Sequence, residues 1–169
     1  SIGDAIDQYR FDRNPKPKGQ AAEPLLFFPN GALVHFAVSN SEVHMVTKLA
    51  GPATAFLPFN LGNDGAAGNP VNPQGGHRTA YLWEQVWARE SWLEILGRYL
   101  IAQRDKKKQI MEVIFPRYHQ LDVTRKLQAA VLGDGPGGKY LIQHSAGSGK
   151  TNSIAWTAHF LAELHDAGH

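Results

Sequence analysis

The chain contains no cysteine, which excludes disulfide bonds and thiolate metal sites from its 169 residues. Its apolar runs all fall short of the roughly 20 residues of a membrane span, and no signal peptide is visible. We therefore expect a cytoplasmic protein without a membrane partner. Charged residues are few, at 19%, but 43% of the residues are hydrophobic, which is typical of a folding chain. The net charge of +2 permits nucleic-acid binding without arguing for it.

The first 60 residues predict a β-meander that follows a helix. Asn30-Gly31 is a strong hairpin signal, and it lies between two apolar stretches. The spacing of Ile2, Ala5, Ile6 and Tyr9 is helical. The expected elements are a helix within 1–13, a proline-rich loop at 14–24, strands at 25–28, 32–38 and 42–49, and an irregular segment at 50–60.

A helical connector is expected at about 79–114. Thr79 is expected to cap its first helix. Ser91 followed by Glu94 forms a capping-box pattern, which predicts a second helix running to about Gln103.

Two segments of this region allow more than one interpretation. Residues 61–78 combine Gly, Asn and Pro, which is typical of a domain boundary and equally of a functional loop. The basic run Lys106–Lys108 is able to contact phosphate, but a short basic run is more often a solvated turn.

The strongest chemical signal is the segment HSAGSGKT at 144–151, between an expected strand at 140–143 and an expected helix at 151–164. A phosphate chain needs many N–H donors and a counter-charge, and glycines let the backbone curl so that its N–H groups point inward. The pattern predicts that Lys150 reaches the β- and γ-phosphates of ATP and that the Thr151 hydroxyl ligates Mg²⁺. The predicted phosphate loop also includes Ala146, Gly147, Ser148 and Gly149. His144 replaces the usual first glycine, and the alternative is a turn that only joins strand to helix.

A second signal is FPRYHQ at 115–120, which opens an expected helix at 118–132. The amide of Gln120 is able both to donate to and to accept from an adenine edge. On spacing alone, a proline-started helix with a surface glutamine is the simpler interpretation.

Gln120, about thirty residues before Lys150, resembles the adenine-reading glutamine of superfamily two helicases and translocases. The resemblance to motor subunits of type I restriction enzymes covers nearly the whole chain. It is carried by FPRYHQLDVTRKL, YLIQHSAGSGKT, VHMVTKLAGPATAFLPFNLGNDGAAGNP and YLWEQVWARESWLEIL. The implied fold is α/β: the C-terminal end of a PD-(D/E)xK-type nuclease domain at 1–60, a loop and helical connector at 61–114, and the beginning of a RecA-like P-loop parallel-sheet domain at 115–169.

The resemblance implies an ATP-dependent DNA translocase and endonuclease that binds Mg-ATP, moves duplex DNA and then cleaves it, with modification and specificity subunits as partners. Gln8 corresponds to a nuclease glutamine, but the family often has Gln-x-x-x-Tyr, whereas Asp12 is the fourth residue after Gln8. An ordinary surface glutamine is equally compatible. No Asp…Glu-x-Lys core of a nuclease precedes Gln8, so we expect a piece of a longer protein that is inactive alone. The alternatives are another P-loop enzyme, such as a small-molecule kinase, and a non-catalytic connector.

Overall fold

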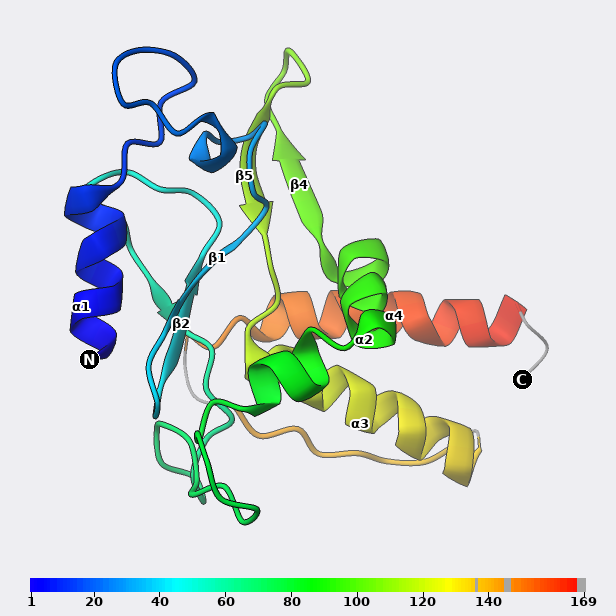
Figure 1. The fold of residues 1–169 in the computed structure, drawn as a ribbon. Coiled ribbons are helices and arrows are strands. Elements are labelled where there is room, and N and C mark those ends of the chain that lie inside the picture. Colours follow the sequence, from blue (N-terminus) through cyan, green and yellow to red (C-terminus); the bar gives the residue numbers. More distant parts are fainter. Residues whose placement is uncertain (136, 145–146, 167–169) are drawn as a thin grey trace. The chain divides into compact units, whose positions relative to one another are not determined.

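The computed structural model describes residues 1–135, 137–144 and 147–166, and the chain divides into two compact units, Ser1–Phe115 and Pro116–His169. The first unit holds two small antiparallel sheets with short helices, and the second holds two long helices (Figure 1). The chain is therefore of mixed α/β type. Within the described ranges, no helix has both the length and the hydropathy that crossing a membrane demands.

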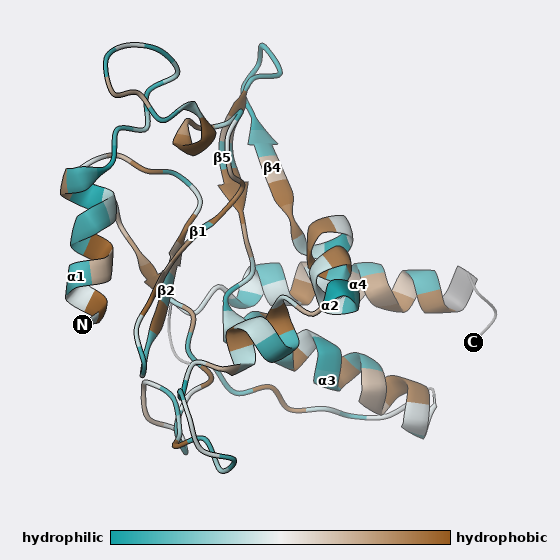
Figure 2. Ribbon diagram, viewed as in Figure 1, coloured by the Kyte–Doolittle hydropathy of each residue, from teal (hydrophilic) through white to brown (hydrophobic). Residues whose placement is uncertain are grey.

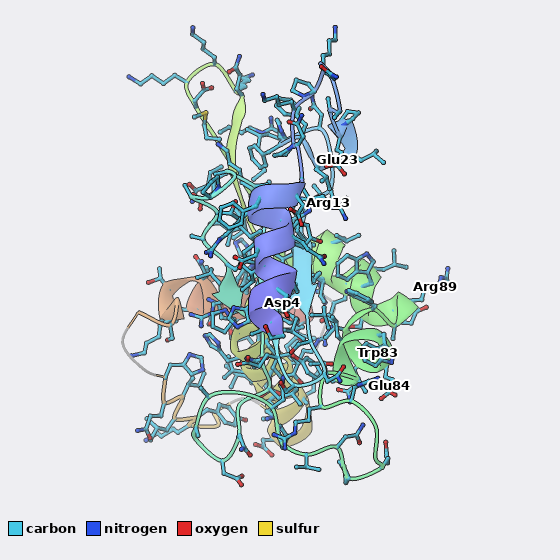
Figure 3. The ribbon with its side chains drawn as sticks, turned by 60° about the vertical axis from the view of Figure 1, so that its left-hand side comes forward. Asp4, Arg13, Glu23, Trp83, Glu84 and Arg89 are labelled. Carbon is cyan, nitrogen blue, oxygen red and sulfur yellow. The ribbon has the colours of Figure 1, made fainter. Side chains whose placement is uncertain are left out.

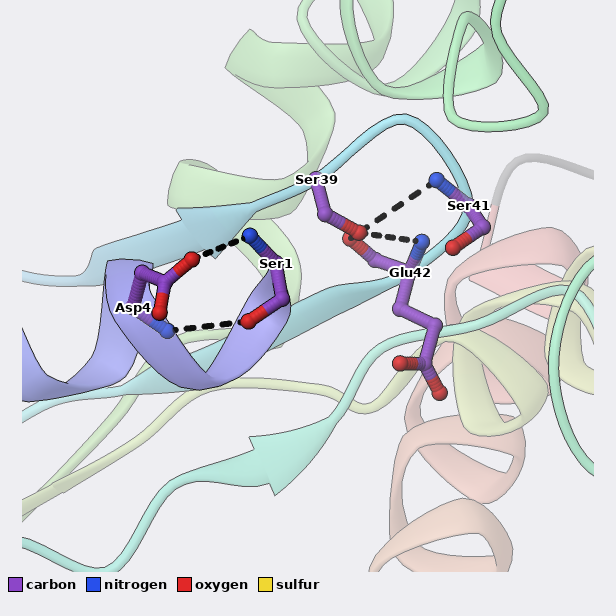
Figure 4. A network of polar contacts seen from close by, with 5 residues as sticks. All are labelled: Ser1, Asp4, Ser39, Ser41 and Glu42. Atoms are coloured by element: carbon purple, nitrogen blue, oxygen red, sulfur yellow. Dashed lines mark hydrogen bonds and ion pairs between the residues drawn. The ribbon is translucent and has the colours of Figure 1, made fainter.

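The expected helix at the start of the chain is confirmed as two consecutive segments, α1 (Ile2–Asp7) and η1 (Gln8–Asp12). The Ser1 hydroxyl accepts the backbone N–H of Asp4 at 3.3 Å, and the Asp4 carboxylate accepts from the Ser1 amino group at 2.5 Å (Figure 4). This capping box satisfies donors that a helix start leaves unpaired.

The first sheet contains three antiparallel strands in the order β1 (His35–Val38), β2 (Val43–Val46) and β3 (Leu57–Pro58). In the turn between β1 and β2, the Ser39 hydroxyl accepts the N–H groups of Ser41 and Glu42 (Figure 4). Side chains alternate between buried and half-buried along β1 and β2, so one face of the sheet is covered.

The hairpin expected at Asn30-Gly31 does not form, and that prediction was wrong. Its first strand is replaced by the short 3-10 helix η2 (Pro24–Leu26). Proline has no N–H to give to a ladder, and both Pro24 and Pro29 fall in this stretch. The Gly31 N–H instead donates to the Phe27 carbonyl at 2.7 Å. The strand β1 therefore pairs forward with β2.

The last turn of the N-terminal helix, η1, packs against the first sheet. The Tyr9 ring lies 5.6 Å from the rings of His35 and Phe56. The Arg10 guanidinium donates to the Thr54 carbonyl at 2.9 and 3.2 Å. These contacts place η1 beside β1 and the segment before β3.

The middle of the chain is helical over a shorter stretch than the expected connector at about 79–114. The helical part consists of η3 (Leu82–Val86), α2 (Arg89–Glu94) and η4 (Ile95–Tyr99). Ser91 lies inside α2 and does not open a helix. The Thr79 hydroxyl donates to the Ser39 carbonyl at 2.8 Å and does not cap one.

The segment expected to finish this second helix forms a β-hairpin instead. It consists of β4 (Ile101–Arg104) and β5 (Ile110–Ile114). The Asp105 carboxylate accepts the N–H groups of Lys107 and Gln109 at 2.8 and 2.9 Å, which closes the turn. A side chain that captures nearby N–H groups in this way favours a turn over a helix. The basic run Lys106–Lys108 therefore lies in an exposed turn.

An aromatic cluster surrounds the half-buried Phe36 in the first unit, where Phe59 and Phe115 are buried and Trp87 is 43% exposed. The ring of Phe36 lies 5.5 to 5.9 Å from those of Phe59, Trp87 and Phe115, in edge-on geometry that suits their quadrupoles. Trp92 lies 5.9 Å from Phe115. Figure 2 shows apolar residues along β1, β2 and β5.

The long segment at 61–78 has no regular helix or strand, and it is tied to the first sheet. Asn69 is only 3% exposed. Its amide nitrogen donates to the Ser41 carbonyl at 2.8 Å and to Asn60 Oδ1 at 2.9 Å, and its oxygen accepts the Leu61 N–H. One buried asparagine thus holds this loop against the β1–β2 turn.

The second unit contains α3 (Tyr118–Asp134) and α4 (Lys150–Asp166), which confirm the two expected helices within two residues at each end. The strand expected at 140–143 is absent. Leu141 is 94% exposed there. A strand needs a neighbour to pair with, and the described part of this unit offers only helices. The parallel sheet is therefore not formed in this structure.

Candidate functional site

The glycine-rich loop leads directly into α4. Gly147 and Gly149 have φ of +71° and +80°, a region that side chains disfavour. Lys150 begins the helix, and Lys150 and Thr151 are exposed in its first turn. The first N–H groups of a helix have no partner within the helix, and the helix dipole favours an anion there. This end of α4 therefore offers N–H donors, an ammonium group and a hydroxyl together.

Gln120 contacts this loop from α3. Its Nε2 donates to the Gly149 carbonyl at 2.9 Å, across 29 residues of sequence. Its Oε1 accepts the backbone N–H of Arg117 at 2.8 Å, and its side chain is 3% exposed. The Thr124 hydroxyl donates to the Gln120 carbonyl at 2.9 Å. The amide nitrogen of Gln120 therefore holds the loop, and its amide oxygen caps the start of α3.

Gly149 is required for space as well as for backbone conformation. A Cβ atom built at this position would collide with Gln120 Nε2. Gly147 has a similar φ, but a Cβ there would meet no atom within 4 Å. The close approach of Gln120 thus distinguishes the two glycines.

His119 is a site residue that the sequence motifs do not single out, because an isolated histidine has no metal-ligand spacing around it. Its Nε2 donates to the Ser148 carbonyl at 2.8 Å, and its ring meets that of His144 edge-on at 5.2 Å. Burial lowers the pKa of His119, the Ser148 hydrogen bond raises it, and Arg117 and His144 lower it further. Its position next to Gln120 in FPRYHQ was the available signal.

Several polar atoms around the loop have no hydrogen-bond partner in the part of the chain that the structure describes. They are His144 Nδ1, Ser148 Oγ and Ser153 Oγ. Buried polar atoms usually have a partner, so these are groups that a polar ligand is able to satisfy. His144, Lys150 and Ser153 line a cavity of about 340 Å³ whose walls are otherwise mainly aliphatic.

The nuclease side of the prediction rests on Gln8, which is exposed in η1 and lines a separate cavity of about 460 Å³ in the first unit. Tyr9, Arg13 and Glu23 line the same cavity. Over residues 1–135, 137–144 and 147–166, no group of three or more His, Asp or Glu side chains is placed to hold a metal ion.

The predicted ATP-binding residues that the structure describes lie together: Gln120, Gly147, Ser148, Gly149, Lys150 and Thr151. Ala146 lies outside the described residues. Comparison of the chain with protein-family models, curated proteins and solved structures finds no match.

Proposed function

We propose that this chain is part of an ATP-dependent DNA translocase and endonuclease subunit of a type I restriction-modification system. The observation that carries the proposal is the hydrogen bond from Gln120 to Gly149, which joins the two motifs that the sequence predicts to bind a nucleotide. The nuclease and RecA-like folds, the modification and specificity subunits as partners, and a cytoplasmic location belong to the same proposal.

The residues around the loop fit a nucleoside triphosphate with Mg²⁺. The Lys150 ammonium and the Thr151 hydroxyl are exposed at the first turn of α4, where a phosphate and its metal ion are usually held. The positive φ values of Gly147 and Gly149 let the backbone curl around an anion. When bound, ATP supplies the phosphoryl group, and these residues hold it and neutralise its charge.

The absence of a strand at 140–143 bears on the RecA-like part of the proposal and not on phosphate binding. Phosphate binding needs the glycine turn and the helix start, and the described residues Gly147–Lys150 provide a positive-φ turn that leads into α4. A RecA-like sheet needs strands on either side of this segment. The two parts are therefore tested by different measurements.

Nucleotide binding is tested by titrating the chain with Mg-ATP and following the heat released. Lys150→Ala should weaken binding about tenfold or more, because a hydrogen bond to a charged group contributes about 1.5–3 kcal/mol. Lys126→Ala is the matched control, since Lys126 is an exposed lysine of α3. If both variants bind like the unsubstituted chain, the loop does not hold the phosphates.

Gln120→Ala separates two roles for this glutamine. If Gln120 reads adenine, the substitution abolishes a preference for ATP over GTP. If it only holds the loop, both nucleotides lose affinity equally.

The motor activity is tested in the full subunit by ATP hydrolysis with and without duplex DNA. Stimulation by duplex supports the translocase. An absence of nucleotide binding favours the non-catalytic connector, and phosphate transfer to a small acceptor favours a kinase.

A further inference from the structure

Basic side chains are concentrated in two short segments of the first unit. One is the loop at 14–20 and the other is the tip of the β4–β5 hairpin at 104–109. Together they carry six basic side chains and one acidic one, a net charge of +5, whereas the whole chain has a net charge of +2. The remaining residues are therefore net negative. We call these segments the two basic tips.

The two basic tips project from the same end of the first unit. Figures 1 and 3 show both at this end in views 60° apart, and Figure 2 shows both as hydrophilic. Their five lysines are all exposed. None of the five has an ion-pair partner in the described ranges. The five are Lys16, Lys18, Lys106, Lys107 and Lys108.

The one acidic side chain in the tips does not neutralise the lysines, because it is used inside the hairpin turn. Asp105 accepts two backbone N–H groups, and its own carbonyl accepts the N–H of Lys108 at 2.9 Å. The guanidinium of Arg104 is also engaged, since it donates to the Lys108 carbonyl at 2.9 Å. The turn is therefore internally bonded, and the three lysine side chains are left to the solvent.

The other tip is closed at its base. Arg13 and Glu23 form an ion pair of 3.2 Å, and both are labelled in Figure 3. The Glu23 carboxylate also accepts the N–H of Asn14 at 2.8 Å, and the Glu23 N–H donates to the Asn14 carbonyl at 2.8 Å. The lysines of this loop thus project from a defined frame, which lowers the ordering cost of binding a partner.

We infer that the two basic tips form a contact surface for the phosphate backbone of duplex DNA. Lysine holds phosphate as a point charge, without the planar geometry that reads a base edge. Neither tip contains a large apolar side chain of the kind that enters a membrane interface. The surface should therefore bind duplex DNA without sequence preference and with strong salt dependence. The choice of DNA as the partner rests on the proposed function, whereas the surface rests on the charges of the first unit.

The test is the affinity of the chain for a labelled short duplex, measured by fluorescence anisotropy between about 50 and 200 mM salt. Replacing Lys106, Lys107 and Lys108 with Gln should lower affinity about tenfold or more at the low-salt end. It should also reduce the salt slope by up to about 3, because each phosphate contact contributes about 0.9 to the slope. The double substitution at Lys16 and Lys18 should reduce the slope by up to about 2.

The control for net charge is a triple Gln variant at three exposed basic positions elsewhere, Arg89, Lys126 and Lys139. It should change affinity by less than about twofold, because surface substitutions away from a contact have small effects. Equal losses in the control and in the hairpin variant would show that only total charge matters and would overturn the inference. So would an absence of duplex binding, or binding to phosphatidylserine vesicles in place of DNA.

Mg-ATP titration of the same proteins separates this inference from the proposed function. The hairpin variant should bind nucleotide like the unsubstituted chain. If the chain fails to bind Mg-ATP but its duplex affinity still depends on the tips, the proposed nucleotide site is wrong and the DNA surface stands. If nucleotide binds and the tip substitutions leave duplex affinity unchanged, the proposed nucleotide site stands and the inferred DNA surface is wrong.

Discussion

Substitution of Gly149 with Ala tests whether the contact between Gln120 and the loop holds the second unit together. At φ of +80°, a Cβ atom costs about 1–2 kcal/mol from backbone strain. The same atom would collide with Gln120 Nε2, so the Gln120 amide must move away from the Gly149 carbonyl. The lost hydrogen bond adds about 1 kcal/mol. We expect Gly149→Ala to lower the free energy of unfolding of this unit by about 2–3 kcal/mol.

Gly147→Ala is the matched control, because its φ of +71° is similar and its Cβ would meet no atom within 4 Å. It should cost only the backbone strain, about 1–2 kcal/mol. The assay is amide hydrogen exchange of α3 and α4, read by mass spectrometry, since it reports the opening of each segment separately. Tryptophan fluorescence would mix the two units, because both contain tryptophan.

A double-mutant comparison isolates the contact itself. On a Gln120→Ala background the collision and the hydrogen bond are both absent, so Gly149→Ala and Gly147→Ala should cost the same. Two results would refute the reasoning: equal costs in the unsubstituted chain, or a difference that persists without the Gln120 side chain.

Three further predictions concern other contacts. Thr79→Val should destabilise the first unit by about 1–2 kcal/mol in thermal unfolding, because it removes the buried donor to the Ser39 carbonyl, and Thr79→Ser should restore most of the loss. Asp105→Ala should speed hydrogen exchange along β4 and β5, because two turn N–H groups lose their acceptor; unchanged exchange would mean that the strands alone hold the hairpin. Because burial lowers the pKa of His119 from 6.5 in the folded state, the unfolded chain binds a proton first as pH falls. The free energy of unfolding of the second unit should therefore decrease as pH falls from about 6.5 to the folded pKa of His119. Urea unfolding at several pH values measures this dependence, and His119→Asn should make it flatter over the same pH range.

The helices of the second unit were predictable because their signals are local. Pro116 precedes the start of α3, and a glycine-rich loop precedes the start of α4, so the residue types alone predict where both helices begin. The residues of the loop also followed from their spacing. The hydrogen bond between Gln120 and Gly149 did not, because it depends on how α3 packs against α4.

The β4–β5 hairpin could not be predicted in the same way. The apolar spacing of Ile95 and Tyr99 continues into Leu100 and Ile101 without a proline or a glycine to end the helix. The helical run ends because Ile101 pairs with Ile114, thirteen positions later, across the Asp105 turn. At Asn30-Gly31 the opposite occurs: the local signal predicts a hairpin, but the neighbouring prolines prevent the first strand from pairing.

The way in which Asn69 fastens the long Gly-rich loop has a consequence for protein engineering. The loop is held at Asn69 and again at Thr79, while Gly75 and Gly76 between them are exposed. Lengthening a flexible loop costs little, because closure entropy grows only with the logarithm of its length. A foreign epitope or a dye-labelling tag inserted between Gly75 and Gly76 should therefore leave the β1–β2 turn undisturbed. The same insertion next to Asn69 would separate the buried amide from its partners in the sheet.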